Sequence, residues 1–191
     1  MQAIYNMLYV PGLPLKTMGI IIGLWLIVSH AIALVKPGIV QPFLKRFPRN
    51  ENLGAVLVVI AFAWAFIFWS CMDLGEFFTI ERPVQIVIIA VCVGVLIYVK
   101  EFLAVRALGF LMILAAAPIL DSAFLKEPQS RLLIVAFAYV IAVKGMFYVG
   151  IPYLLRDQIT WVLAKKSRYT AGFAAGLAFG VLVLGCALMF W

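Results

Sequence analysis

Long apolar runs separated by short polar stretches dominate this sequence. A transmembrane helix needs about 20 mostly apolar residues to cross roughly 30 Å of hydrocarbon. Stretches near this length fall at residues 18–35, 53–72, 84–99, 107–124, 132–152 and 171–191. None alternates as a barrel strand does, and backbone groups in lipid must be satisfied within their own segment. We therefore predict an all-α polytopic membrane protein with six transmembrane helices in a single membrane-embedded domain, residues 1–191.

Two polar connections predict short amphipathic helices at the membrane surface. In the first, Ile39, Phe43 and Phe47 recur at helical spacing, and in the second, Leu155 and Ile159 begin a similar apolar stripe. Such helices lie in the headgroup plane, with their basic side chains toward the lipid phosphates. The residues expected to contact headgroups are Lys45, Arg46, Arg49, Arg156, Lys165, Lys166 and Arg168.

An arginine followed closely by a glycine precedes every second span. The pairs are Arg49/Gly54, Arg106/Gly109 and Arg168/Gly172. We interpret them as marking three tandem helical hairpins, with internal repeats at 17–72, 83–125 and 131–191. Independent convergence on a basic loop followed by glycine would produce the same pattern.

Composition agrees with the apolar pattern. Hydrophobic residues make up 66% of the chain and charged residues 12%, whereas soluble domains have about 45–50% and about 25%. A net charge of +7 would suggest nucleic acid as the partner of a soluble protein. Here the basic residues flank apolar spans, which indicates anionic lipid headgroups and excludes nucleic acid.

Small residues inside the spans permit two interpretations each. Gly172, Gly176 and Gly180 would leave a flat ridge for close helix packing, although glycine is also common in membrane helices generally. Cys71, Cys92 and Cys186 have no C-x-x-C spacing and are expected to be small buried residues. A disulfide between Cys71 and Cys186 is the alternative.

The charges also predict an orientation. One side of a six-span chain receives Lys36, Lys45, Arg46, Arg49, Lys100, Arg106, Arg156, Lys165, Lys166 and Arg168, and the other receives Lys16, Arg82, Lys126 and Arg131. Because cytoplasmic loops carry the excess of Lys and Arg, we expect the first side in the cytoplasm and both termini outside. We expect the bacterial inner (plasma) membrane.

Lys144 is the charged residue farthest from any span end. A charged side chain within a membrane is costly and marks a candidate site. It could act as an ion or anion ligand, or it could pair with a carboxylate: Glu101 is the nearest in depth, and a carboxylate of another subunit is the alternative. The alternative is a structural lysine whose ammonium reaches the headgroups or a backbone carbonyl.

His30, the single histidine, has a similar depth in the first span. With Ser29 and Tyr148 it could form a small polar cluster that relays protons, since histidine titrates near neutral pH. The alternative is a histidine that only packs. Glu101 and Arg106 complete the set of candidate binding residues.

Catalytic and cofactor motifs are missing from the sequence, so we do not predict an enzyme, a metal site or a cofactor. The first functional hypothesis is a structural or accessory subunit, or scaffold, of a membrane assembly, with membrane lipids and either further copies or other membrane subunits as partners. The second is a small transporter or channel that uses Lys144 and His30. The third is lipid binding through the basic segments.

Overall fold

The computed structural model describes residues 1–9 and 12–191, and describes only the backbone of Phe77 and Phe78. Within these ranges the chain forms helices and no strand. In chain order the elements are α1 (Gln2–Tyr9), α2 (Leu15–Val35), α3 (Pro37–Arg46), η1 (Phe47–Arg49), α4 (Glu51–Cys71), η2 (Gly75–Ile80), α5 (Glu81–Tyr98), α6 (Leu103–Ala123), η3 (Gln129–Arg131), α7 (Leu132–Gly150), α8 (Tyr153–Leu163) and α9 (Lys166–Met189).

Six of these helices are long and apolar enough to cross a membrane: α2, α4, α5, α6, α7 and α9. At 1.5 Å per residue, the 21 residues of α2 extend ~31 Å, which matches the ~30 Å of bilayer hydrocarbon. Each helix overlaps one of the six predicted runs. The prediction of an all-α protein with six helices long and apolar enough to span a membrane is confirmed.

The spans that pack together are not those of the predicted hairpins. Extensive contacts join α2 to α9, α6 to α7, and α4 to both α5 and α6. The first span thus packs against the last, and the others pack across the boundaries of the predicted repeats. The hairpin prediction assumed that consecutive spans pack together. The helices α3 and α8 are long enough to carry the chain away from the preceding span, whereas α5 and α6 share no extensive contact although only the turn at residues 99–102 joins them.

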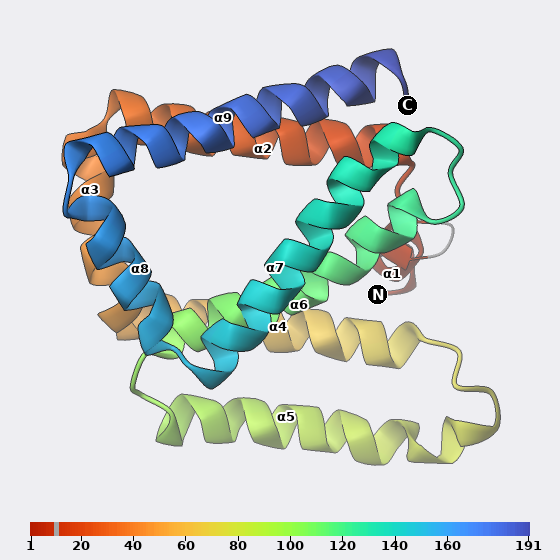
Figure 1. Cartoon of the computed structure of the whole chain (residues 1–191). Coiled ribbons are helices and arrows are strands. Elements are labelled where there is room, and N and C mark those ends of the chain that lie inside the picture. Colours follow the sequence, from red (N-terminus) through yellow and green to blue (C-terminus); the bar gives the residue numbers. More distant parts are fainter. Residues whose placement is uncertain (10–11) are drawn as a thin grey trace.

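The helices form two groups that meet at one end of the molecule (Figure 1). There, a buried cluster joins Leu15, Met18 and Ile22 of α2 to Ile119 of α6 and Ile134 of α7. The α2–α9 pair diverges from α6 and α7 toward the other end, where α3 and α8 contact each other and bridge the two groups (Figure 1). This buried cluster therefore lies near α1 and the C terminus, and a second one, formed by Val58, Leu103 and Ala107, joins α4 to α6.

The ten basic residues assigned to one side by the sequence gather at the end where the groups diverge. This end, which we call the basic end, comprises residues 36–51 (α3, η1 and the start of α4), residues 99–106 (the turn and the first turn of α6) and residues 153–169 (α8 and the first turn of α9) (Figure 1). It also holds three of the acidic residues, Glu51, Glu101 and Asp157. The opposite end has four basic and five acidic residues.

Glycines set the close approach of α2 and α9. A Cβ on Gly23 would lie 2.9 Å from Leu184 Cβ, and a Cβ on Gly180 would lie 2.8 Å from Leu26 Cβ. Gly176 faces the ring of His30, whereas nothing lies within 4 Å of a Cβ on Gly172. The predicted glycine ridge is therefore used at two of its three positions. Cys71, Cys92 and Cys186 are free, so the disulfide alternative is wrong.

The turn between α5 and α6 has no glycine or proline. The chain reverses at Phe102, whose φ of 54° and ψ of 31° are left-handed, a conformation that costs an ordinary residue roughly 1–2 kcal/mol. The guanidinium carbon of Arg156 lies 5.9 Å from the centre of the Phe102 ring. The charges of Lys100 and Glu101 separate the third predicted span from the fourth, but no local signal indicated the turn itself.

Candidate functional site

Lys144 lies on α7 with an exposed side chain. Among the described residues it makes no hydrogen bond or ion pair; the single ion pair there joins Arg156 to Asp157. Glu101 is also exposed, in the turn before α6, and is not paired with Lys144. The described residues therefore supply Lys144 with no partner, and its function stays a prediction.

His30 and Ser29 belong to the α2–α9 contact. The His30 ring packs over Gly176 and lies 5.6 Å, centre to centre, from the Phe173 ring. Its Nδ1 is 2.8 Å from the Leu26 carbonyl oxygen, which can only accept, so the imidazole donates there. The Ser29 hydroxyl donates to the same carbonyl at 3.2 Å. These contacts support a packing role, and they do not join His30 to Lys144.

Tyr148 fixes α7 to α8. Its side chain is 5% exposed, and its hydroxyl donates a hydrogen bond to Oε1 of Gln158 at 2.7 Å. A buried phenol usually needs such a partner, because an unmade hydrogen bond in an apolar setting is costly. Gln158 was not part of the predicted polar cluster with Tyr148, because Gln158 lies on the connection that follows the span.

Arg106 lies in the first turn of α6 and reaches α7. Its Nη1 donates to the Val149 carbonyl oxygen at 2.8 Å. That carbonyl is among the last four of α7, which have no partner within the helix. The Nε of Arg106 is buried and has no hydrogen-bond partner among the described residues. Arg106 thus caps the end of α7 with Nη1, while its Nε donates to no described residue.

A pocket of about 300 Å³ lies beside Arg106, between α4, α5, α6 and α7. Its walls are apolar and include Val58 and Phe62 of α4, Val95 of α5 and Phe110 of α6; Arg106 is the charged residue among those that line it. Arg106 was among the candidate binding residues named from the sequence. The apolar walls carry no sequence signal, because they resemble any lipid-facing position.

The basic residues expected to contact headgroups all lie at the basic end. Arg168 is partly buried and the other six are exposed. The guanidinium of Arg168 lies 4.5 Å from the centre of the Trp161 ring, a cation–π arrangement that leaves its hydrogen-bond donors available. Large exposed apolar side chains lie on the same helices, among them Ile39 and Phe43 of α3 and Trp161 of α8.

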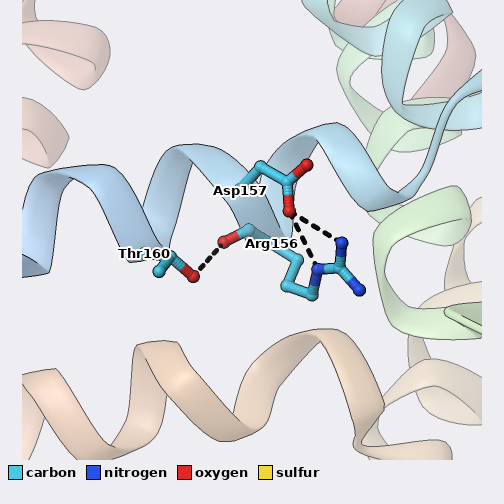
Figure 2. A network of polar contacts seen from close by, with 3 residues as sticks. All are labelled: Arg156, Asp157 and Thr160. Atoms are coloured by element: carbon cyan, nitrogen blue, oxygen red, sulfur yellow. Dashed lines mark hydrogen bonds and ion pairs between the residues drawn. The ribbon is translucent and has the colours of Figure 1, made fainter.

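Arg156 differs from the other basic residues because it is already paired. Its Nε donates to Oδ1 of Asp157 at 2.9 Å, and its Nη2 lies 2.8 Å from the same oxygen (Figure 2). The Thr160 hydroxyl donates to the Arg156 carbonyl oxygen at 2.8 Å (Figure 2). Both side chains of the pair are about half exposed, at 46% and 54%, where an ion pair contributes at most about 1 kcal/mol.

The candidate site is therefore the basic end, where basic residues and exposed apolar side chains lie on and around α3 and α8, and where the pocket beside Arg106 is found. The polar cluster expected around Lys144 and His30 is not brought together by contacts in the described residues. No family model, curated protein or solved structure matches this chain.

Proposed function

We propose that this integral membrane protein binds anionic lipids of one leaflet through its basic end. The observation that carries the proposal is the arrangement of α3 and α8, which contact each other at the end that holds ten of the fifteen Lys and Arg residues. A cation near an anionic membrane surface contributes about 1 kcal/mol to its attraction. Exposed Phe43 and Trp161 suit burial at the acyl boundary.

The proposal includes an orientation. The basic end faces the cytoplasm, both termini lie outside, and α3 and α8 lie in the headgroup plane of the plasma membrane. The support is the lopsided count of Lys and Arg between the two ends, which follows the excess of positive charge in cytoplasmic loops.

Lipid preference in bilayers tests this function. The wild-type protein, reconstituted in nanodiscs with mixed phosphatidylglycerol and phosphatidylcholine, should enrich phosphatidylglycerol in its lipid shell. Combining Lys165→Gln, Lys166→Gln and Arg168→Gln should lower this enrichment. The matched control neutralises the opposite end by Lys16→Gln, Arg82→Gln and Lys126→Gln and should keep it. Equal losses in both triple variants, or no loss in the first, would refute a site at the basic end.

An accessory subunit is the second candidate function, and α5 is the observation that favours it. None of its residues is buried, and its extensive contacts are limited to α4 and η2. Lipid tails can cover an apolar helix without driving association, so a partner must be found directly. Photo-crosslinking from Ile86, which is 67% exposed, should capture a second copy or another membrane protein. A monodisperse monomer in mild detergent with no crosslinked product would contradict this candidate.

The transporter or channel hypothesis stays a third proposal. No contact between Lys144 and His30 supports it among the described residues. Lys144 and His30 lie on α7 and α2, which share no extensive contact.

A further inference from the structure

We infer that the pocket beside Arg106 is a discrete binding site for one alkyl chain of an anionic amphiphile, with the anionic head on the Arg106 guanidinium. The inference rests on the proposed lipid binding for the class of ligand, and it adds a defined site with defined stoichiometry. Two independent observations carry it: the unmet charge of Arg106 and the shape of the pocket.

The charge of Arg106 is not balanced within the described part of the chain. Its contact there is with a neutral carbonyl oxygen of Val149, and its buried Nε has no acceptor. A partly buried cation and an unpaired buried donor are both costly. An anionic oxygen would accept from Nε and neutralise the charge. The planar guanidinium suits the paired oxygens of a carboxylate or phosphate.

Arg106 lies at one end of a pocket whose other lining residues are apolar, so the pocket matches an amphiphile with a charged head and an apolar chain. Val99, Leu103 and Arg106 line it close to the basic end, while Phe62 and Phe110 line it deeper along α4 and α6. Phe110 follows Arg106 by one helical turn, ~6 Å along the axis. The Phe62 and Phe110 rings lie 5.4 Å apart, centre to centre, and flank the deep part of the pocket. An anionic head at Arg106 thus leaves its chain pointing toward the bilayer centre.

The volume suits part of one alkyl chain, with the rest of the chain at the open side of the pocket. About 300 Å³ lies at the low end of the roughly 300–1,000 Å³ found for small-molecule pockets. A single acyl chain of a fatty acid or lysophospholipid, or one chain of a larger lipid whose second chain stays outside, meets this limit. The head must be anionic, and a carboxylate and a phosphate fit the same donors.

Native mass spectrometry of the full chain in mild detergent tests the site. Palmitate, palmitoyl-lysophosphatidylglycerol and uncharged monopalmitoylglycerol are titrated separately. We expect one tightly bound equivalent of an anionic probe and at least about tenfold weaker binding of the uncharged one, since a charge-assisted hydrogen bond contributes about 1.5–3 kcal/mol. Binding of palmitate alone would identify a carboxylate site, binding of the lysophospholipid alone a phosphate site, and binding of both a general anion site.

Two variants test the two halves of the site. Arg106→Gln removes the charge and should weaken the one-equivalent binding at least about tenfold. Val95→Phe leaves Arg106 in place and fills the pocket from partly exposed α5, so it should weaken binding even if Arg106→Gln folds poorly. Wild-type binding in Val95→Phe, or equal affinity for the uncharged probe, would overturn the inference.

The triple variant of Lys165, Lys166 and Arg168 separates this inference from the proposed function. It should keep the one-equivalent binding while it loses the bilayer preference for phosphatidylglycerol. If Arg106→Gln binds the anionic probe normally while the triple variant loses the bilayer preference, the pocket inference fails alone. If the triple variant keeps the preference while Arg106→Gln loses its bound equivalent, the proposed function fails and the pocket stands.

Discussion

Gly109 of α6 and Gly145 of α7 face each other with their backbones almost touching. A Cβ on Gly109 would lie 2.7 Å from the Gly145 carbonyl oxygen, and a Cβ on Gly145 would lie 2.6 Å from the Gly109 carbonyl oxygen. Backbone atoms cannot move aside as a flexible side chain does. This pair therefore sets the distance between the two helices, and it lies next to Lys144.

Gly109→Ala should destabilise the protein by about 1–3 kcal/mol, the usual cost of overpacking. Gly185→Ala is the matched control, because a Cβ there meets nothing within 4 Å. Alanine within a helix gains roughly 0.5–1 kcal/mol over glycine, so the control should be neutral or stabilised. Thermal unfolding in detergent, followed by circular dichroism, measures both variants. Equal stability of the two would contradict the close contact.

Tyr169→Phe should weaken the attachment of α9 to α2. The Tyr169 side chain is 4% exposed, and its hydroxyl donates to the Ala33 carbonyl oxygen at 2.7 Å. That carbonyl belongs to the last turn of α2 and has no partner within the helix. Loss of the hydrogen bond from Tyr169 should lower the unfolding free energy by about 1–3 kcal/mol, because the buried Ala33 carbonyl oxygen is left without a donor. Tyr153→Phe on α8, at 52% exposure, should leave the same unfolding measurement unchanged.

Lys144→Met should leave the unfolding free energy unchanged or raise it, by less than about 3 kcal/mol. The reason is that Lys144 has no hydrogen bond or ion pair in the described structure, while a lysine deep in a bilayer costs up to about 2.5–3.5 kcal/mol. A clearly destabilised variant would show that Lys144 has a partner outside these contacts. A change in ion or anion flux through proteoliposomes would instead favour the transporter hypothesis.

Alkaline pH should loosen α1. Tyr9 lies outside the membrane-spanning helices and accepts a hydrogen bond from Trp64 Nε1 at 3.0 Å. Burial raises the pKa of the Tyr9 phenol; the bond from Trp64 opposes part of this rise, and the nearby Tyr5 adds to it. The folded state therefore favours the neutral phenol. This contribution to stability is present below about pH 10, the unfolded value, and is lost as pH rises through the folded pKa.

Tyr9→Phe provides the reference for that titration, because it cannot ionise. The unfolding free energy of both proteins is measured from about pH 9 to about pH 12. As pH rises, the unfolding free energy of the wild type should fall relative to that of the variant. Parallel pH profiles for the two proteins would rule out a contribution from the Tyr9 phenol.

The candidate site was only partly readable from the sequence. Arg106 and the seven headgroup residues stood out because a charge beside an apolar run is visible locally. The role of Arg106 was not visible, since its acceptor on Val149 and the pocket wall at Phe62 lie on other helices. His30 attracted attention as a lone titratable residue, yet its ring packs on Gly176, a residue far along the chain.

The sequence by itself determined the six spans and the gathering of positive charge in alternate connections. Both follow from how each segment partitions between lipid and water, a property that sums along a local stretch of residues. The tertiary structure alone decided that α2 pairs with α9 rather than α4, and that Phe102 turns the chain. Helix pairing in lipid depends on the fit of particular faces, such as Gly23 against Leu184, because apolar surface alone favours no partner over another.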